Sequence, residues 1–137
     1  MPFQWLEMRI AEERDRRRRE AEIHARLAPA MEELHRLLAG CLDAYNREFG
    51  VAAATIAADA RGFTIRVEEP PGEVRVDAVQ DLPGFHIRRG ETVLPVEIGL
   101  LPGAKLFYRD QQADQYLTMD ELTRKILDRV LFPKLRE

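Results

Sequence analysis

Serine is absent from the 137 residues of this chain, and other nucleophilic side chains are scarce. Cys41 is the single cysteine, Asn46 is the single asparagine, and lysine occurs only at Lys105, Lys125 and Lys134. Without serine, the strained nucleophile turn of serine hydrolases cannot form, and no glycine-rich phosphate loop ending in Gly-Lys-Ser or Gly-Lys-Thr is present. The metal-binding spacings Cys-x-x-Cys and His-Glu-x-x-His are missing as well. We therefore predict no metal, no cofactor and no motif-defined catalytic residues.

Paired cysteines and long apolar runs are also missing. A lone cysteine cannot form an internal disulfide, and the sequence begins without the basic region and unbroken apolar stretch of a signal peptide. No apolar run approaches the roughly 20 residues that cross a bilayer. We therefore expect a cytoplasmic protein without a transmembrane segment.

Charged side chains are abundant, at 33% of residues, but their signs nearly cancel to a formal net charge of −3. This balance provides no overall attraction for nucleic acid or for an anionic membrane. The run from Arg16 to Arg19 does not alter it, because five acidic residues and five arginines lie between Glu12 and Glu22. Four consecutive helical positions also point to every side of a helix. We interpret this segment as a solvated, salt-bridged helix and predict no nucleic-acid partner.

Residues 3–28 contain neither glycine nor proline and are rich in good helix formers. Pro29 would normally end the helix, yet an apolar stripe continues in phase across it, through Ile23, Leu27, Ala30, Met31, Leu34, Leu38, Cys41 and Tyr45. The pattern predicts a long helix kinked at Pro29, or two nearly coaxial helices, ending before Gly50. A continuous helix over residues 3–49 would be roughly 70 Å long, whereas a compact domain of this size is roughly 35–40 Å across. We therefore divide the chain into a helical arm, residues 1–28, and a single domain, residues 29–137.

The start of the arm carries large apolar residues ahead of the charged segment. On a helix, Trp5 and Met8 point away from the other apolar side chains, and Glu7 interrupts the apolar face, so contact with a membrane surface is not expected. A patch of exposed apolar residues is typical of protein contacts. We predict that the chain forms a homodimer, or binds another protein, through Phe3, Trp5, Leu6, Ile10, Ile23 and Leu27.

The middle of the chain changes from helical periodicity to the alternation of β-strands. Apolar residues alternate with polar ones on both sides of the turn Pro70-Pro71-Gly72, at Phe63, Ile65, Val67, Val74 and Val76. Turns at Leu82-Pro83-Gly84 and Arg89-Gly90-Glu91 separate further strands, and a weaker strand is expected over residues 53–58. The pattern predicts an antiparallel β-meander of about six short strands. Pro95 would place the strand over residues 93–100 at a sheet edge or at a bulge.

Charge pairing predicts a register for the hairpin formed by the alternating segments 63–67 and 74–76. Pairing Val67 with Val76 places Arg66 opposite Asp77, whereas a register two residues tighter places Arg66 opposite Arg75. Because opposite charges across a strand pair are favourable and like charges are not, we predict the first register.

The C-terminal segment predicts a helix that begins at a capping box. Thr118 and Glu121 have the spacing of that motif, and the apolar stripe that follows is Met119, Leu122, Ile126 and Val130. We expect this helix to pack on the apolar face of the sheet. The predicted fold class is therefore α+β, with a long N-terminal helix or helix pair, an antiparallel meander and a closing helix.

Candidate ligand-binding residues lie on the polar face of the predicted sheet. Arginine side chains can hold a carboxylate or phosphate by paired hydrogen bonds, and the candidates on neighbouring strands are Arg66, Arg75, His86 and Arg88. The opposing interpretation is an exposed sheet face with alternating charge, since Glu68, Glu73 and Asp77 are interleaved.

The remaining candidates are the helical histidines and the cysteine. His24 and His35 would lie roughly 16 Å apart along a helix, which is too far for both to bind one metal within a chain. Cys41 falls within the apolar stripe, where a free cysteine acts as a small hydrophobic residue.

Three functions from different classes remain. The leading hypothesis is a non-enzymatic interaction or scaffold protein that self-associates through its N-terminal helix. The second is a module that binds a small anionic ligand through the arginine-bearing sheet face or a pocket between sheet and helices. The third is an enzyme that uses His86 as a general base, with a neighbouring arginine stabilising an oxyanion.

Overall fold

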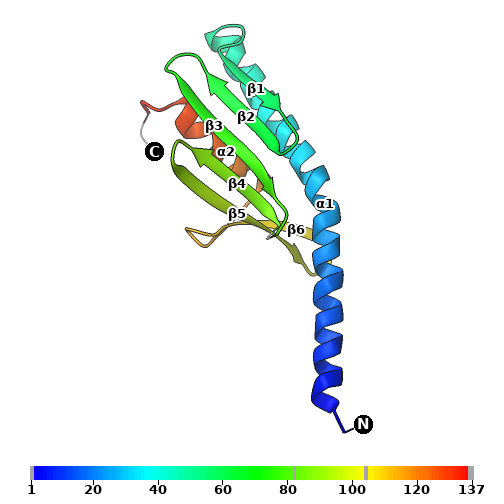
Figure 1. Cartoon of the computed structure of the whole chain (residues 1–137). Coiled ribbons are helices and arrows are strands. Elements are labelled where there is room, and N and C mark those ends of the chain that lie inside the picture. Colours follow the sequence, from blue (N-terminus) through cyan, green and yellow to red (C-terminus); the bar gives the residue numbers. More distant parts are fainter. Residues whose placement is uncertain (1, 82, 104, 136–137) are drawn as a thin grey trace.

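The first third of the chain forms one helix in the computed structural model, which describes residues 2–81, 83–103 and 105–135. This helix, α1, spans Gln4–Phe49 and contains Pro29 in its interior. Figure 1 shows an unbroken helix whose axis bends between its free N-terminal part and the part beside the sheet. Of the two sequence-based alternatives, the continuous helix is therefore present and the helix pair is not. Gly50 ends it, with a φ of 122° and a backbone N–H donated to the carbonyl of Asn46.

The C-terminal half of α1 is amphipathic and packs on the rest of the chain. Its buried residues recur every three or four positions, at Leu27, Ala30, Leu34, Leu38 and Leu42. The prediction that Cys41 continues this stripe was wrong, because Cys41 is exposed. Steps of four residues from Leu34 keep one face toward the sheet, and Cys41 lies roughly 100° around the helix from Leu42.

Seven antiparallel strands follow α1, and each pairs with its neighbours in chain order, which confirms the meander. The sequence predicted about six, because the three-residue strand β7 is too short to show alternation. Leu82 of the predicted turn lies outside the described residues. The strands are β1 (Ala54–Ala58), β2 (Gly62–Val67), β3 (Gly72–Val79), β4 (Gly84–Arg89), β5 (Thr92–Leu101), β6 (Lys105–Asp110) and β7 (Gln115–Leu117).

The register predicted for the β2–β3 hairpin was wrong. Val67 pairs with Gly72 instead of Val76, so the connection is four residues long and Phe63 lies opposite Val76. Arg66 now faces Glu73. This register also pairs opposite charges, which is why electrostatics alone could not select the correct one.

The placement of Pro95 was also mispredicted. Strand β5 lies between β4 and β6, and both pairings run in uniform register without a bulge. Proline is tolerated there because β6 ends at Asp110, opposite Val96, and therefore needs no N–H from Pro95. The carbonyl of Pro95 still accepts a bond from the backbone N–H of Gln111 at 3.1 Å.

The second helix, α2 (Met119–Leu131), begins at the predicted capping box. The Thr118 side chain accepts a bond from the backbone N–H of Glu121, and the Glu121 side chain accepts one from the backbone N–H of Thr118. Leu122, Ile126 and Val130 are buried, which confirms that α2 closes on the sheet.

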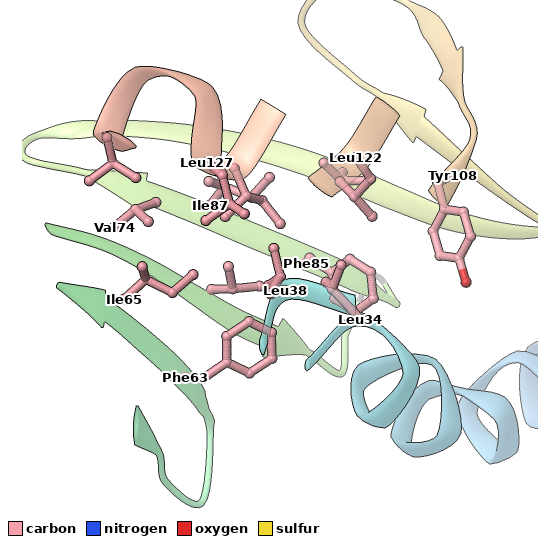
Figure 2. Close-up of a cluster of buried hydrophobic side chains, with 14 of the residues drawn as sticks. Leu34, Leu38, Phe63, Ile65, Val74, Phe85, Ile87, Tyr108, Leu122 and Leu127 are labelled. Atoms are coloured by element: carbon pink, nitrogen blue, oxygen red, sulfur yellow. The ribbon is translucent and has the colours of Figure 1, made fainter. Parts of the chain in front are cut away.

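Both helices cover the same face of the sheet, and the opposite face is open (Figure 1). Figure 2 shows the core between them, where Leu34 and Leu38 of α1 meet sheet residues such as Phe85. Full burial of a leucine stabilises a fold by roughly 1.5–3 kcal/mol, so this cluster anchors α1 to the sheet. Among the described residues, no helix is long and apolar enough to cross a membrane.

Candidate functional site

The N-terminal part of α1 extends beyond the sheet, as Figure 1 shows. Arg19 donates a hydrogen bond to the carbonyl of Leu100 at 3.2 Å, which places the departure of the helix from the body near that residue. At the far end, which we call the tip (residues 3–10), the large apolar side chains are exposed: Phe3 53%, Trp5 66%, Leu6 40%, Met8 65% and Ile10 45%.

Ion pairs within the helix involve three of the four arginines of the run from Arg16 to Arg19. Arg16 pairs with both Glu13 and Glu20, Arg17 pairs with Glu13, and Arg18 pairs with Asp15. Hydrogen bonds from Arg16, and then from Arg17, lower the pKa of the exposed Glu13 to about 2. Most of the arginine run therefore has carboxylate partners on its own helix, in keeping with the interpretation as a salt-bridged surface.

Ile23 and Leu27 pack against the body of the protein, whereas the apolar residues of the tip are exposed. Leu27 is 2% exposed and belongs to the core, and Ile23 packs against that core. Both are therefore engaged within the chain itself. Of the six predicted self-association residues, Phe3, Trp5, Leu6 and Ile10 are exposed, Ile23 is partly buried and Leu27 is buried.

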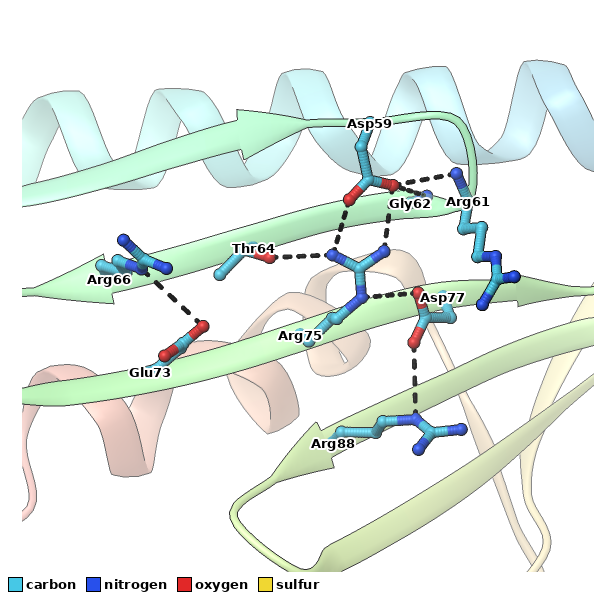
Figure 3. A network of polar contacts seen from close by, with 9 residues as sticks. All are labelled: Asp59, Arg61, Gly62, Thr64, Arg66, Glu73, Arg75, Asp77 and Arg88. Carbon is cyan, nitrogen blue, oxygen red and sulfur yellow. Dashed lines mark hydrogen bonds and ion pairs between the residues drawn. The ribbon is translucent and has the colours of Figure 1, made fainter.

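The predicted ligand-binding arginines share the open face of the sheet, where Arg66 and Glu73 form a pair apart from the network around Arg75 and Arg88 (Figure 3). Arg75 is the centre of the group. Its Nη1 and Nη2 bond both carboxylate oxygens of Asp59 at 2.7 and 2.9 Å, and its Nε bonds Asp77 at 2.7 Å. Nη1 also donates to the Thr64 hydroxyl at 2.9 Å. The backbone N–H groups of Arg61 and Gly62 hold Asp59 in place.

This pairing shifts the protonation equilibria of both partners. The Arg75 guanidinium, and then the two backbone N–H groups, hold the pKa of Asp59 well below its usual range. The Asp59 carboxylate in turn raises the pKa of Arg75. An arginine binds an anion through the paired N–H groups of its guanidinium. In Arg75 the carboxylate of Asp59 already accepts these bonds.

The other arginines of this face also have carboxylates nearby. Arg66 lies 3.7 Å from Glu73, and Arg88 lies 3.4 Å from the second oxygen of Asp77. His86 is half-buried on β4, opposite Asp77 on one side and Pro95 on the other. Within the described part of the chain, no side chain hydrogen-bonds its imidazole. The face therefore brings the four predicted residues together but resembles a closed ion-pair network more than a vacant anion site.

The two helical histidines lie apart from one another. His24 lies 3.8 Å from Glu20, and the ring of His35 meets Phe63 edge-on at a centroid distance of 5.4 Å. Over residues 2–81, 83–103 and 105–135, no three potential metal ligands cluster together.

Cys41 lines a groove of about 550 Å³ with Tyr45 and Leu127. Although Cys41 is exposed, partial desolvation in this groove, and then the charge of Asp120, raises the pKa of its thiol, which disfavours the reactive thiolate.

Arg89 is a further site residue that the sequence analysis did not select. Strand β4 alternates inward Phe85 and Ile87 with outward His86 and Arg88, so Arg89 takes an inward position. A charged residue at an inward position is unusual, because isolated buried charges are costly. That break in alternation was visible in the sequence and could have identified Arg89 as a candidate.

Similarity to known proteins adds no functional information to these observations. The tip, the ion-pair network and the inward Arg89 are therefore interpreted from their own geometry. No family model, no curated protein and no solved structure matches the chain.

Proposed function

We propose that this chain is a non-enzymatic interaction protein that self-associates through the tip of its N-terminal helix. The observation that carries the proposal is the exposure of five large apolar side chains on a helix end that extends away from the body. Patches of this kind on soluble surfaces typically mark protein contacts.

The occupant that best fits the tip is the tip of a second copy. Phe3, Leu6 and Ile10 are separated by three and then four residues, the spacing of a coiled-coil seam. The next residues at that spacing are Glu13 and Arg17, which pair with each other within the helix. Two such helices would therefore bury their apolar ends against one another and keep their charged segments in solvent.

The size of the tip limits the strength of this association. Stable interfaces use roughly 20–30 residues on each side, and the tip supplies five large apolar side chains. We therefore expect a reversible dimer whose population depends on protein concentration. Trp5 is the only tryptophan of the chain, so its fluorescence reports directly on burial of the tip.

The test compares two charge-matched double variants of the full chain. The tip variant, Leu6→Glu with Ile10→Glu, adds two negative charges to the seam. The control variant, Ala11→Glu with Ala21→Glu, adds the same charge at exposed positions of the same helix. Molecular mass is measured by sedimentation equilibrium over a range of concentrations, and circular dichroism verifies that each variant keeps its helix.

The proposal predicts that the original chain and the control shift from monomer toward dimer as concentration rises, with a blue shift of Trp5 emission. The tip variant should remain monomeric. A chain that stays monomeric throughout, or a tip variant that dimerises as well as the control, would show that self-association through the tip is wrong.

A further inference from the structure

A second candidate site lies on the helix-covered side of the molecule and is independent of the tip. It is a cavity of about 600 Å³ between α2 and the ends of β4, β5 and β7. Binding sites for small molecules typically have volumes of roughly 300–1,000 Å³. Apolar side chains form part of its lining, contributed by Ile87, Leu94 and Leu117.

Arg89 enters this cavity from the end of β4. Its Nη2 donates to the backbone carbonyl of Lys125 on α2 at 3.1 Å, which fixes the direction of the guanidinium. Its Nε is buried and, among the described residues, has no hydrogen-bond partner. An unsatisfied buried donor on a charged group destabilises the fold, so a partner supplied from outside would be stabilising.

The environment of Arg89 contains a further positive charge. Burial lowers the pKa of Arg89, and the nearby charge of Arg129 lowers it further, while Asp128 acts in the opposite direction. Arginine nevertheless remains protonated in proteins, so the positive charge persists in the cavity.

Two other half-buried arginines show what Arg89 lacks. Arg75 bonds the carboxylates of Asp59 and Asp77, and Arg109 bonds those of Glu97 and Asp114. Within the described residues, Arg89 forms no ion pair with a carboxylate. The fold thus neutralises comparable guanidinium groups internally and leaves this one without a carboxylate.

The acidic residues that line the cavity do not supply the missing partner. Glu121 accepts bonds from the backbone N–H and hydroxyl of Thr118 at the start of α2. Lys125 donates to the buried Asp110 at 3.1 Å. The cationic residues of the lining are Arg89, Arg124, Lys125 and Arg129, and the acidic ones are Glu121 and Asp128; the charge of Lys125 is offset by Asp110.

We propose that this cavity binds a small organic anion, with a carboxylate or phosphate head at Arg89 and an apolar body against Ile87, Leu94 and Leu117. Because Nε is buried in the unliganded chain, a small shift of the guanidinium toward the cavity accompanies binding, and the head then accepts the bond that Nε donates. Planar guanidinium groups match both oxyanion types, so the two heads are distinguished by experiment. The apolar wall excludes a fully hydrated inorganic ion as the preferred occupant.

The test uses three six-carbon probes that share an apolar body, namely hexanoate, hexyl phosphate and hexylamine, together with inorganic phosphate. Binding to the full chain is followed by NMR through the Arg89 Nε–Hε resonance, which reports on the proposed bond itself. We expect one of the two organic anions, or both, to shift this resonance saturably. Inorganic phosphate should bind at least about tenfold more weakly, and hexylamine should leave the resonance unchanged.

Two matched variants separate Arg89 from its neighbour. Arg89→Gln should weaken anion binding by about tenfold or more, the loss expected for a hydrogen bond to a charged group. Arg88→Gln removes the adjacent arginine, which lies on the open face beside Asp77, and should leave affinity within about twofold. A third variant, Asp128→Asn, removes a negative charge from the lining of the cavity and should strengthen anion binding.

The direct resonance keeps the test decisive even if Arg89→Gln impairs folding. The proposal is overturned if neither organic anion shifts the Arg89 resonance, or if the Arg88 and Arg89 variants bind equally well. Equal binding of hexylamine, or equal affinity for inorganic phosphate, would also contradict it. These outcomes do not depend on the oligomeric state, so failure here leaves the proposed self-association unaffected.

Discussion

Lys125 of α2 donates a hydrogen bond to Asp110 at the end of β6, at 3.1 Å. Asp110 is 2% exposed and also accepts bonds from the backbone N–H groups of Gln112 and Ala113. Burial by itself would raise the pKa of Asp110, but the Ala113 N–H, the Lys125 ammonium and the Gln112 N–H outweigh it and lower the pKa. One carboxylate thus joins the β6–β7 turn to the closing helix.

Replacing this carboxylate should destabilise the fold. Asp110→Asn keeps the shape of the side chain but removes the charge that Lys125 and two N–H groups contact. We expect the free energy of unfolding to fall by about 1–3 kcal/mol in urea denaturation. Asp114→Asn is the control, because the side chain of Asp114 is 80% exposed in its ion pair with Arg109. Its effect should stay within about 0.5 kcal/mol. Equal losses in the two variants would contradict the assigned role of Asp110.

The contribution of Asp110 should also depend on pH. Because its pKa is lower in the folded than in the unfolded chain, the stabilisation is present above the unfolded value of about 3.9. It is lost as pH falls through the folded value. The difference in unfolding free energy between the original chain and Asp110→Asn should therefore stay constant above about pH 5 and shrink as the pH falls below about 4. A difference that grows on acidification would refute the direction of the shift.

The ion pair of Asp59 and Arg75 predicts how the Asp59 carboxyl group titrates. The pKa of Asp59, followed by carboxyl NMR, should lie well below the usual range in the original chain. Arg75→Gln removes the largest cause of that shift and should move the pKa back toward about 3.9. Arg66→Gln, which removes an arginine paired with Glu73 on the same face, should leave it unchanged. An Asp59 pKa that is insensitive to Arg75→Gln would mean that the backbone N–H groups dominate.

Two glycines should respond to alanine in opposite directions. A Cβ at Gly62 would lie 1.9 Å from the carbonyl oxygen of Val76, a backbone atom that cannot swing aside. A Cβ at Gly40, inside α1, would meet nothing within 4 Å. We expect Gly62→Ala to lower the free energy of unfolding by about 1–3 kcal/mol and Gly40→Ala to raise it by about 0.5–1 kcal/mol. Thermal or urea denaturation measures both, and changes of the same sign would contradict this account.

Elements determined by local contacts were predictable from the sequence. The capping box of Thr118 and Glu121, the end of α1 at Gly50 and the alternation of β2 each involve residues close together in the chain. The β2–β3 register was not predictable from charge, because opposite charges pair in more than one alignment. The length of the turn between the strands selects the alignment that forms. The prediction of a sheet edge or bulge at Pro95 failed because a central strand tolerates proline where the neighbouring strand has already ended. The end of β6 cannot be read from the residues of β5.

The candidate sites were predictable only in part. The arginines of the open face were identified as a group, but Asp59, which lies in the connection after β1, was not recognised as the partner of Arg75. The tip residues were found because apolar side chains ahead of a charged helix are conspicuous. Arg89 was missed although the alternation of β4 already indicates its inward position. Its lack of an ion pair among the described residues is visible only after the chain has folded.

The length of the projecting helix also separates the electrostatics of the two proposed sites. Gln4 and Arg19 are about 22 Å apart along the helix, by its rise of 1.5 Å per residue. The Debye length at physiological ionic strength is about 8 Å, so the charges of the body are largely screened at the tip. Two copies can therefore meet at their tips without appreciable repulsion between their bodies. Occupation of the Arg89 cavity by an anion should likewise leave tip association unchanged, because the projecting helix keeps the two sites electrostatically independent.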